Sequence, residues 1–268
     1  MRAIVLVAGA VFRESVRDRV PYSMVVFAVL LMAASYLISQ LTAGQDLKII
    51  KDLGLASIAI FGLLIAVFIG IGLVSKEVER KSVYGLLTKP VTRSQFILGK
   101  YAGLVLTLAI NIAAMVVAYY AVLYYMDVTA SAATRAGWPA PAMDPRLLLA
   151  TLLIFAELAV ITAVALFFST FTSPLLAILL TLGLWIAGQF NADLRNFENV
   201  IDAPAAIWVA KVLYYVLPNL APFNIKAEVV HGFPVSMRHV GLTLLYAAVY
   251  AGMLLVAAAA IFRRRDFK

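Results

Sequence analysis

Glu157 is the one ionisable side chain inside a long apolar stretch, residues 147–192. Counted from Leu147 at about 1.5 Å per residue, it lies about 15 Å deep in a membrane. A carboxylate there costs about 2.5–3.5 kcal/mol on insertion scales, so it needs a partner or a proton. Asn111 is expected at a similar depth in another apolar stretch. Two hypotheses follow: both residues line a translocation path or proton-responsive element, or Glu157, protonated or bonded to Asn111, fixes two helices together.

Residues 75–100 form the one long, strongly charged segment between apolar runs. Helical spacing of apolar residues at 83–87 predicts a first short helix, which Pro90 ends. Thr92 and Gln95 fit the capping box of a second helix that runs directly into the next apolar stretch. Such an ordered segment is expected to dock a cytoplasmic partner. The alternative is a solvated loop whose basic residues only set orientation and touch anionic lipid.

Gly62, Ala66 and Gly70 form a stripe of small residues at a spacing of four. Such a stripe lets another membrane helix approach closely. The helix that it meets is either a neighbour in the same chain or part of a second subunit.

The sequence carries no signature of catalysis or of a resident cofactor. It has no cysteine and no GxSxG, HExxH, GxGxxG or phosphate-loop motif. Glu228, His231 and His239 are suitable zinc ligands by type, but nothing in their spacing fixes a geometry, so no metal site is predicted. The chain therefore has no visible means of using ATP itself.

The composition indicates an integral membrane protein. The 268 residues are 64% apolar and 13% charged, and their mean hydropathy is +0.97. Soluble domains are nearer half apolar and a quarter charged. Apolar runs of about 20 residues, long enough for a hydrocarbon core of ~30 Å, predict six helical spans. Their expected bounds are about 21–42, 53–74, 101–125, 147–169, 174–190 and 240–262. We expect an all-α membrane fold in a single domain over residues 1–268.

The distribution of basic residues predicts that both chain ends face the cytoplasm. Six spans in this orientation place 14 of the 22 Lys and Arg residues inside. These include residues 75–100 and the run Arg263–Arg265. The net charge of +8 is therefore explained by topology, and no nucleic-acid partner is expected.

Two further segments are expected along the membrane surfaces. Residues 3–19 are amphipathic and cationic, which favours an elbow helix in the inner headgroup layer. The alternative is a cytoplasmic extension of the first span. The outer segment, residues 191–239, contains an apolar stretch at 207–217 that Lys211 interrupts and that is too short to cross. It predicts an interrupted helical segment in the outer leaflet before the last span.

One run in the charged segment carries a motif. It reads Glu77-x-Glu79-Arg80-Lys81-Ser82-Val83-Tyr84-Gly85-Leu86-Leu87-Thr88-Lys89-Pro90-Val91-Thr92-Arg93, followed by Gly99-Lys100. This run resembles the first cytoplasmic loop of type-2 ABC exporter permeases, although Lys81-Ser82 stands where that family usually has Gly-Thr. The elbow helix, six spans, interrupted outer segment and Phe262-Arg263-Arg264-Arg265 ending extend the resemblance over the whole chain. In size and ending the chain is similar to permeases of nitrous oxide reductase maturation and gliding-motility systems.

The resemblance implies a transport subunit, not an enzyme, whose separate cytoplasmic ATPase binds ATP and Mg. The chain itself would hold no cofactor. A coupling helix within about 78–90 would sit in a groove of that ATPase. The residues expected to serve this coupling are Glu77, Glu79, Arg80, Lys81, Tyr84, Leu86, Leu87, Pro90 and Arg93.

The resemblance also implies an assembly in the bacterial cytoplasmic (inner) membrane. Its partners would be a second permease copy, identical or paralogous, and membrane lipid, with an envelope accessory protein as a further candidate. The small-residue stripe suits packing between protomers. The alternative class is an ATP-independent protein, either a secondary transporter that uses Glu157 or an envelope-complex scaffold. One midplane charge and no internal repeat disfavour the secondary transporter.

Overall fold

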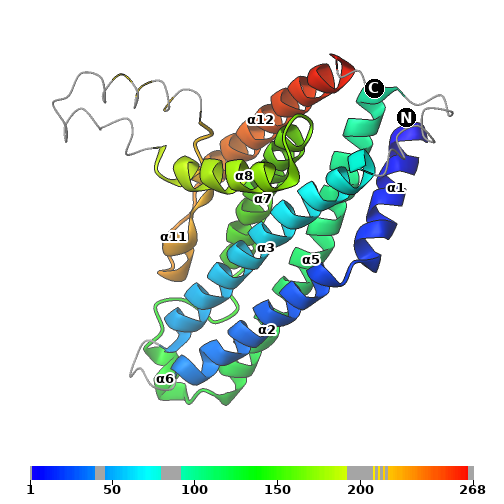
Figure 1. The fold of residues 1–268 in the computed structure, drawn as a ribbon. Helices are drawn as coiled ribbons and strands as arrows, with labels where there is room; N and C mark the ends of the chain where they lie inside the picture. Colours follow the sequence, from blue (N-terminus) through cyan, green and yellow to red (C-terminus); the bar gives the residue numbers. More distant parts are fainter. Residues whose placement is uncertain are drawn as a thin grey trace.

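The computed structural model describes residues 2–39, 46–79, 92–191, 208, 211, 214 and 217–264, with the backbone alone at 73–79 and 263–264. Within these residues every regular element is a helix, which confirms the predicted all-α fold (Figure 1). In chain order the elements are α1 (Arg2–Arg17), α2 (Arg19–Ser39), α3 (Asp46–Glu79), α5 (Arg93–Thr129), α6 (Ala132–Ala136), α7 (Arg146–Ser169), α8 (Pro174–Gln189), η2 (Ala221–Phe223), α11 (Lys226–Val230) and α12 (Met237–Arg264).

Five of the described helices, α2, α3, α5, α7 and α12, are long and apolar enough to cross a membrane. The helix at the predicted fifth span, α8, has 16 residues. It therefore extends only about 24 Å, less than a hydrocarbon core of ~30 Å. The fold is thus an integral membrane bundle of five long helices and one shorter apolar helix.

The turn between α7 and α8 lies where the sequence predicts it. The backbone N–H groups of Thr170 and Phe171 donate hydrogen bonds to the carbonyls of Phe167 and Phe168, respectively, and so form a tight turn. Pro174 then occupies the first position of α8, where its missing N–H costs no helical hydrogen bond. One apolar stretch is therefore divided into two helices rather than forming a single long one.

The centre of the bundle is formed by α3 and α7. Most residues in the apolar parts of these two helices are buried, whereas most of those in α2 and α12 are not. The exposed faces of the outer helices are themselves apolar, for example Phe27 and Leu30 on α2 and Val249 and Met253 on α12. A helix that is apolar on its exposed side suits contact with lipid.

The first predicted surface segment is a separate helix. α1 ends at Arg17 and α2 begins at Arg19, and Figure 1 shows the two at an angle. Between them the Asp18 carboxylate accepts a hydrogen bond from the Val20 N–H at 3.2 Å, which satisfies a free donor in the first turn of α2. α1 is therefore not a straight extension of the first span, and its place in the headgroup layer stays a prediction.

The predicted second helix of the charged segment is confirmed as the beginning of α5. The Gln95 N–H donates to the Thr92 hydroxyl at 3.3 Å, and the Thr92 N–H donates to the Gln95 side chain at 3.2 Å. This capping box opens a helix of 37 residues that continues without a break into the third span. Its length of about 55 Å carries the first turns well beyond a membrane core.

The outer segment folds back onto the central helices. α11 packs against α3 and α7, and its Val229 and Val230 are fully buried. Gly232, with a φ of 76°, turns the chain after α11, and its carbonyl accepts a hydrogen bond from Arg146 at 2.7 Å. The apolar stretch predicted at 207–217 lies mostly outside the described residues.

Candidate coupling end and buried polar site

Arg93, predicted to serve coupling, joins the beginning of α5 to the end of α12. Its guanidinium donates to the Phe262 carbonyl at 2.9 Å. Carbonyls in the last turn of a helix lack a partner within the helix, and they carry the negative end of the helix dipole. A guanidinium is well suited to this position, so the charged segment and the last span are fastened together by a charge-assisted hydrogen bond.

An aromatic stack reinforces the same junction. The rings of Phe96 and Phe262 stack with their centroids 5.9 Å apart. The Lys100 ammonium lies 4.7 Å from the centroid of the Phe96 ring, a cation–π geometry. Around this stack a buried apolar cluster joins α5, α7 and α12, with members Ile97, Leu166, Leu255, Ala258 and Phe262. We call this cluster, together with Arg93 and Phe96, the coupling end.

Two glycines hold α1 against the coupling end. A Cβ atom at Gly99 would lie 2.7 Å from the Cβ of Val7, and one at Gly103 would lie 2.7 Å from the Ala8 carbonyl oxygen. No real Cβ tolerates such distances, so only glycine allows α1 to lie this close to α5. Gly99 and Gly103 have the Gly-x-x-x-Gly spacing, the same kind of helix-packing signal as the small-residue stripe of α3, but packing at this pair was not predicted.

Most of the residues predicted to contact an ATPase lie outside the described residues. These are Arg80, Lys81, Tyr84, Leu86, Leu87 and Pro90. Glu77 and Glu79 belong to the last turn of α3, which extends past the expected end of the second span at residue 74. Of the predicted set, Arg93 has described side-chain contacts, and they lie within this chain.

Glu157 connects α7 to α8. Its Oε1 accepts hydrogen bonds from the Trp185 indole N–H at 2.9 Å and from the Gln189 amide at 2.6 Å. The side chain is 6% exposed. Two N–H donors on one oxygen give the buried carboxylate the partners that it needs in a membrane.

The predicted pairing of Glu157 with Asn111 is wrong. The Asn111 amide donates to the Thr107 carbonyl in its own helix at 2.8 Å. That local bond gives the Asn111 amide a partner within its own helix. The partners of Glu157 stand four residues apart on α8, on one helical face, and a search for polar side chains at that spacing could have found them.

These contacts also show how far α8 extends. Gln189, the last residue of α8, bonds to Glu157 near the middle of α7. The Gly188 carbonyl accepts the Leu220 N–H at 3.0 Å. The chain that returns through residues 217–220 therefore meets the end of α8 halfway along α7. α11 also packs against α7, and the Gly232 carbonyl just after it bonds to Arg146 at the N-terminal end of α7, the half that we call the outer half.

Lys226 on α11 brings a cation towards the buried acid. Burial lowers its pKa, and the charges of Glu157 and Asp52 partly offset that effect. A half-buried ammonium within electrostatic range of two acids is stabilised by them even without direct contact. The polar site of the outer half thus consists of Glu157, Trp185, Gln189 and Lys226.

The glycine stripe of α3 packs within the chain. A Cβ at Gly62 would lie 2.5 Å from Leu158, and one at Gly70 would lie 3.3 Å from the Ala165 Cβ, both on α7. Ala66, between them, is buried. Of the two alternatives for this stripe, the structure shows contact with a neighbour in the same chain. The stripe is what lets α3 and α7 form the core of the bundle.

Lys51 is a buried cation, although the expected bounds of the first two spans leave it in the loop between them. It lies on α3, is 1% exposed, and donates to the Pro141 carbonyl at 2.7 Å. In the same loop the Asp144 carboxylate accepts the Arg146 N–H at 2.9 Å. Lys51 therefore ties the loop before α7 to α3, a role that a lone lysine in the sequence did not reveal.

The two histidines bond to different backbone carbonyls. His231 Nδ1 lies 2.8 Å from the Ala227 oxygen, and His239 Nε2 lies 2.8 Å from the Pro222 oxygen. The His231 ring therefore bonds within its own turn, and the His239 ring joins α12 to the loop that carries η2. No group of three or more metal-ligating side chains occurs in the part of the chain that the structure describes.

The comparisons with known proteins agree with this architecture. The family model described as an ABC-2 family transporter protein matches residues 5–267, nearly the entire chain. None of the curated proteins compared matches the chain.

Proposed function

Because this chain belongs to the ABC-2 family and is a multi-pass permease subunit of an ABC transporter, we propose that a separate cytoplasmic ATPase drives it through residues 75–100. In this proposal the ATPase binds ATP and Mg and performs the hydrolysis. Closure of the ATPase displaces the charged segment, and the attached helices carry the displacement into the membrane. Export or extraction of a substrate follows from that rearrangement.

The observation that carries this proposal is the rigid junction at the coupling end. The segment 75–100 begins with the last turn of α3 and ends with the capped first turns of α5. Arg93 and Phe96 attach that first turn to the end of α12, and Gly99 and Gly103 attach it to α1. A push on the segment would therefore reach four helices at once. A ligand-driven change needs such differential contact between two states to shift an equilibrium.

The contact residues on the charged segment follow from the family motif. Glu77, Glu79 and Arg80 would meet the ATPase where α3 leaves the membrane. Lys81, Tyr84, Leu86, Leu87 and Pro90 would form or end the coupling helix. The described contacts of Arg93 support a role in fastening the coupling end to α12 rather than in touching the ATPase directly.

The proposed assembly contains two permease copies, identical or paralogous, in the bacterial cytoplasmic membrane, with lipid around them and an envelope accessory protein as a further candidate partner. The narrower likeness to nitrous oxide reductase maturation and gliding-motility permeases stays a prediction. ABC-2 family membership favours the ATP-driven class over a secondary transporter or a scaffold.

Coupled ATP hydrolysis in proteoliposomes tests the proposal. We expect the permease and its ATPase together to hydrolyse ATP at a rate that depends on the permease. Leu86→Pro, or Glu77→Lys combined with Glu79→Lys, should abolish that dependence while the permease still inserts into the membrane. Gly252→Ala in α12, where an added Cβ meets no atom within 4 Å, provides the matched control. Wild-type coupling in the loop variants would contradict the docking role.

A further inference from the structure

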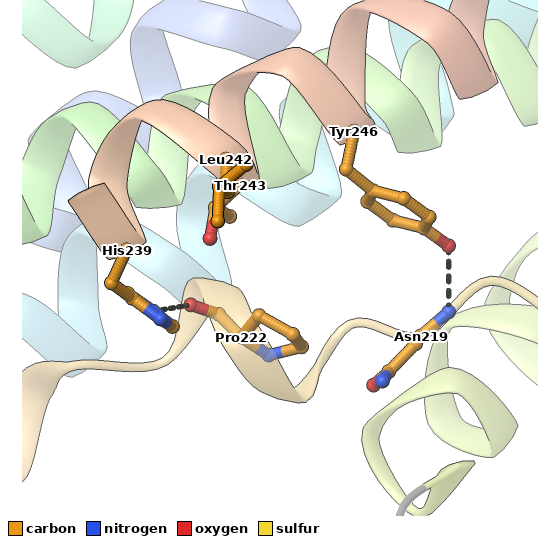
Figure 2. A pocket seen from close by; sticks show the side chains of 6 residues that line it. All are labelled: Asn219, Pro222, His239, Leu242, Thr243 and Tyr246. Carbon is orange, nitrogen blue, oxygen red and sulfur yellow. Dashed lines mark hydrogen bonds between the residues drawn. The ribbon is translucent and has the colours of Figure 1, made fainter.

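A cavity of about 310 Å³ lies between the first turns of α12 and the loop that carries η2 (Figure 2). This is within the size range of small-molecule sites. The residues that line it are Asn219, Pro222, His239, Leu242, Thr243 and Tyr246. The coupling end and the Glu157 site use none of them.

Two hydrogen bonds hold the loop to α12 and leave donors free to serve the cavity. His239 Nε2 lies 2.8 Å from the Pro222 carbonyl, which can only accept, so this nitrogen carries the proton. The Tyr246 hydroxyl accepts from the Asn219 N–H at 2.9 Å, which leaves its own O–H to donate. The Asn219 Oδ1 accepts the Ala221 N–H at 3.2 Å, which leaves its amide N–H groups to donate.

Thr243 is the unusual residue of this cavity. It is 4% exposed, and its hydroxyl forms no hydrogen bond with any residue that the structure describes. Threonines in apolar helices normally donate to the carbonyl four residues earlier, which satisfies the hydroxyl where water is scarce. Within the described helices, this bond is made by Thr107, Thr129, Thr151, Thr162 and Thr181. In Figure 2 the Thr243 hydroxyl is directed towards the loop across the cavity.

One end of the cavity lies at a membrane interface. Counted from Phe262 at about 1.5 Å per residue, Tyr246 is about 24 Å, Thr243 about 28 Å and His239 about 34 Å along α12. A hydrocarbon core is ~30 Å thick, so the cavity extends from the glycerol and phosphate groups of the leaflet opposite the α12 C-terminus, at His239, into the edge of the core, at Tyr246. Leu242 lines the cavity and is 57% exposed, and the exposed Leu245 and Val249 continue the same apolar side of α12.

We propose that this cavity binds the phosphate-ester region of a phospholipid in the leaflet opposite the α12 C-terminus. Thr243, Tyr246 and Asn219 offer O–H and N–H donors to phosphate or ester oxygens, and no carboxylate lines the cavity to repel an anion. An acyl chain would lie along Leu242, Leu245 and Val249. The lipid would wedge the loop of η2 against α12. This inference does not rest on the proposed ATPase coupling.

Titration of the detergent-purified chain with three probes tests the site. The probes are dioctanoyl phosphatidylglycerol, dioctanoylglycerol, which lacks the phosphate, and glycerol 3-phosphate, which lacks the chains. Native mass spectrometry gives the dissociation constants. We expect the phospholipid to bind more tightly than either comparison probe. Thr243→Val, which keeps the shape and removes the donor, should weaken phospholipid binding by roughly tenfold, the effect of one hydrogen bond to a charged group.

Thr181→Val is the matched control, because that hydroxyl already donates to Ala177 at 2.7 Å in its own helix. Its phospholipid affinity should equal that of the unmodified chain. Equal affinity in Thr243→Val and the unmodified chain would overturn the site. Dioctanoylglycerol binding as tightly as the phospholipid would show that only acyl chains are recognised, and equally tight glycerol 3-phosphate binding would assign the site to a soluble phosphate. Either result overturns the lipid proposal.

Discussion

The coupling end and the outer half of this bundle are held together by different forces. At the coupling end, long helices meet through glycine contacts, a stacked pair of rings and one charge-assisted bond between α5 and α12. In the outer half, the end of α8 and the five-residue helix α11 are fastened to α7 and α3, and Glu157 supplies the polar contacts. The coupling end is therefore a rigid junction of long helices, whereas the outer half contains short helices held mainly by side-chain hydrogen bonds.

This difference indicates where each part of a transport cycle would take place. Long helices that touch at the backbone transmit a displacement with little internal change, because close-packed contacts do not deform gradually. Short elements held by a few hydrogen bonds open at lower free energy than the core. We therefore expect the coupling end to move as one unit and the outer half to rearrange. Four substitutions test this contrast.

Gly103→Leu should have the largest effect. A Cβ at this position would lie 2.7 Å from the Ala8 carbonyl oxygen, so α1 must leave α5. Overpacking of this kind costs about 3 kcal/mol. We expect a marked fall in thermal stability and loss of permease-dependent ATP hydrolysis. Gly252→Leu, on an open face of α12, makes the same change without a neighbour and should behave like the unmodified chain. Equal stability of the two variants would contradict the claim that close packing of α1 on α5 makes the coupling end rigid.

Glu157→Ala should follow, with an effect confined to the outer half. It leaves the N–H groups of Trp185 and Gln189 without an acceptor, at a cost of about 2 kcal/mol. Trp185 fluorescence should report a more polar surrounding as α8 loosens. Glu157→Gln keeps one acceptor oxygen and should be intermediate.

Transport by Glu157→Gln separates the two roles first considered for this glutamate. Transport that is unchanged while stability falls supports Glu157 as an anchor of α8. Loss of transport with unchanged Trp185 fluorescence would instead support a role for Glu157 in the translocation path.

Arg93→Ala should have a smaller effect on stability and a clear effect on coupling. It removes the bond to the Phe262 carbonyl, worth about 1.5 kcal/mol for a charged donor. We expect ATP hydrolysis to continue with less transport per ATP, because α12 no longer follows α5. Arg93→Lys keeps a charged donor without the planar fork and should recover part of the transport. A transport-to-ATP ratio unchanged in Arg93→Ala would contradict the role of this residue.

Lys226→Met should have the smallest effect, and this effect should be seen mainly in the pH dependence of the stability. Burial lowers the pKa of Lys226 below its ordinary value of 10.5. Between the lowered pKa and 10.5 the unfolded chain binds a proton that the folded chain does not, so stability rises with pH in that window. Below the lowered pKa the cost of burying the charge is fully present.

Thermal unfolding between pH 7 and about 10.5 checks this sign. Lys226→Met should lack the alkaline rise that the unmodified chain shows. A rise of the same size in both proteins would mean that another group is responsible.

The sequence predicted long elements and failed at contacts between them. The divided stretch before Pro174, the capping box of Thr92 and Gln95, and the continuity of α5 could be read locally, because apolar length and caps are properties of neighbouring residues. Glu157 could be singled out because a carboxylate in the hydrocarbon core is energetically costly. Its partners Trp185 and Gln189 could not be predicted, because the sequence does not show which face of α8 packs against α7.

Short elements and side-chain packing were the least predictable features. The glycine stripe of α3 predicted close contact with another helix, either in the same chain or in a second subunit. The structure shows that this helix is α7 of the same chain. The pair Gly99 and Gly103 was read only as part of a motif. Lys51, just before the expected second span, suggested a loop, whereas its bond to the Pro141 carbonyl allows it to be buried. Each of these outcomes depends on residues distant in the sequence.

Co-purification is the most direct measurement of the central claim that a separate motor docks on residues 75–100. The detergent-solubilised chain should retain an ATPase of the ABC class, and Leu86→Pro should lose it while α1 to α12 remain folded by thermal unfolding. Gly252→Ala should retain the ATPase like the unmodified chain. An unmodified chain that holds no such ATPase, or a Leu86→Pro variant that holds it equally well, would contradict the account.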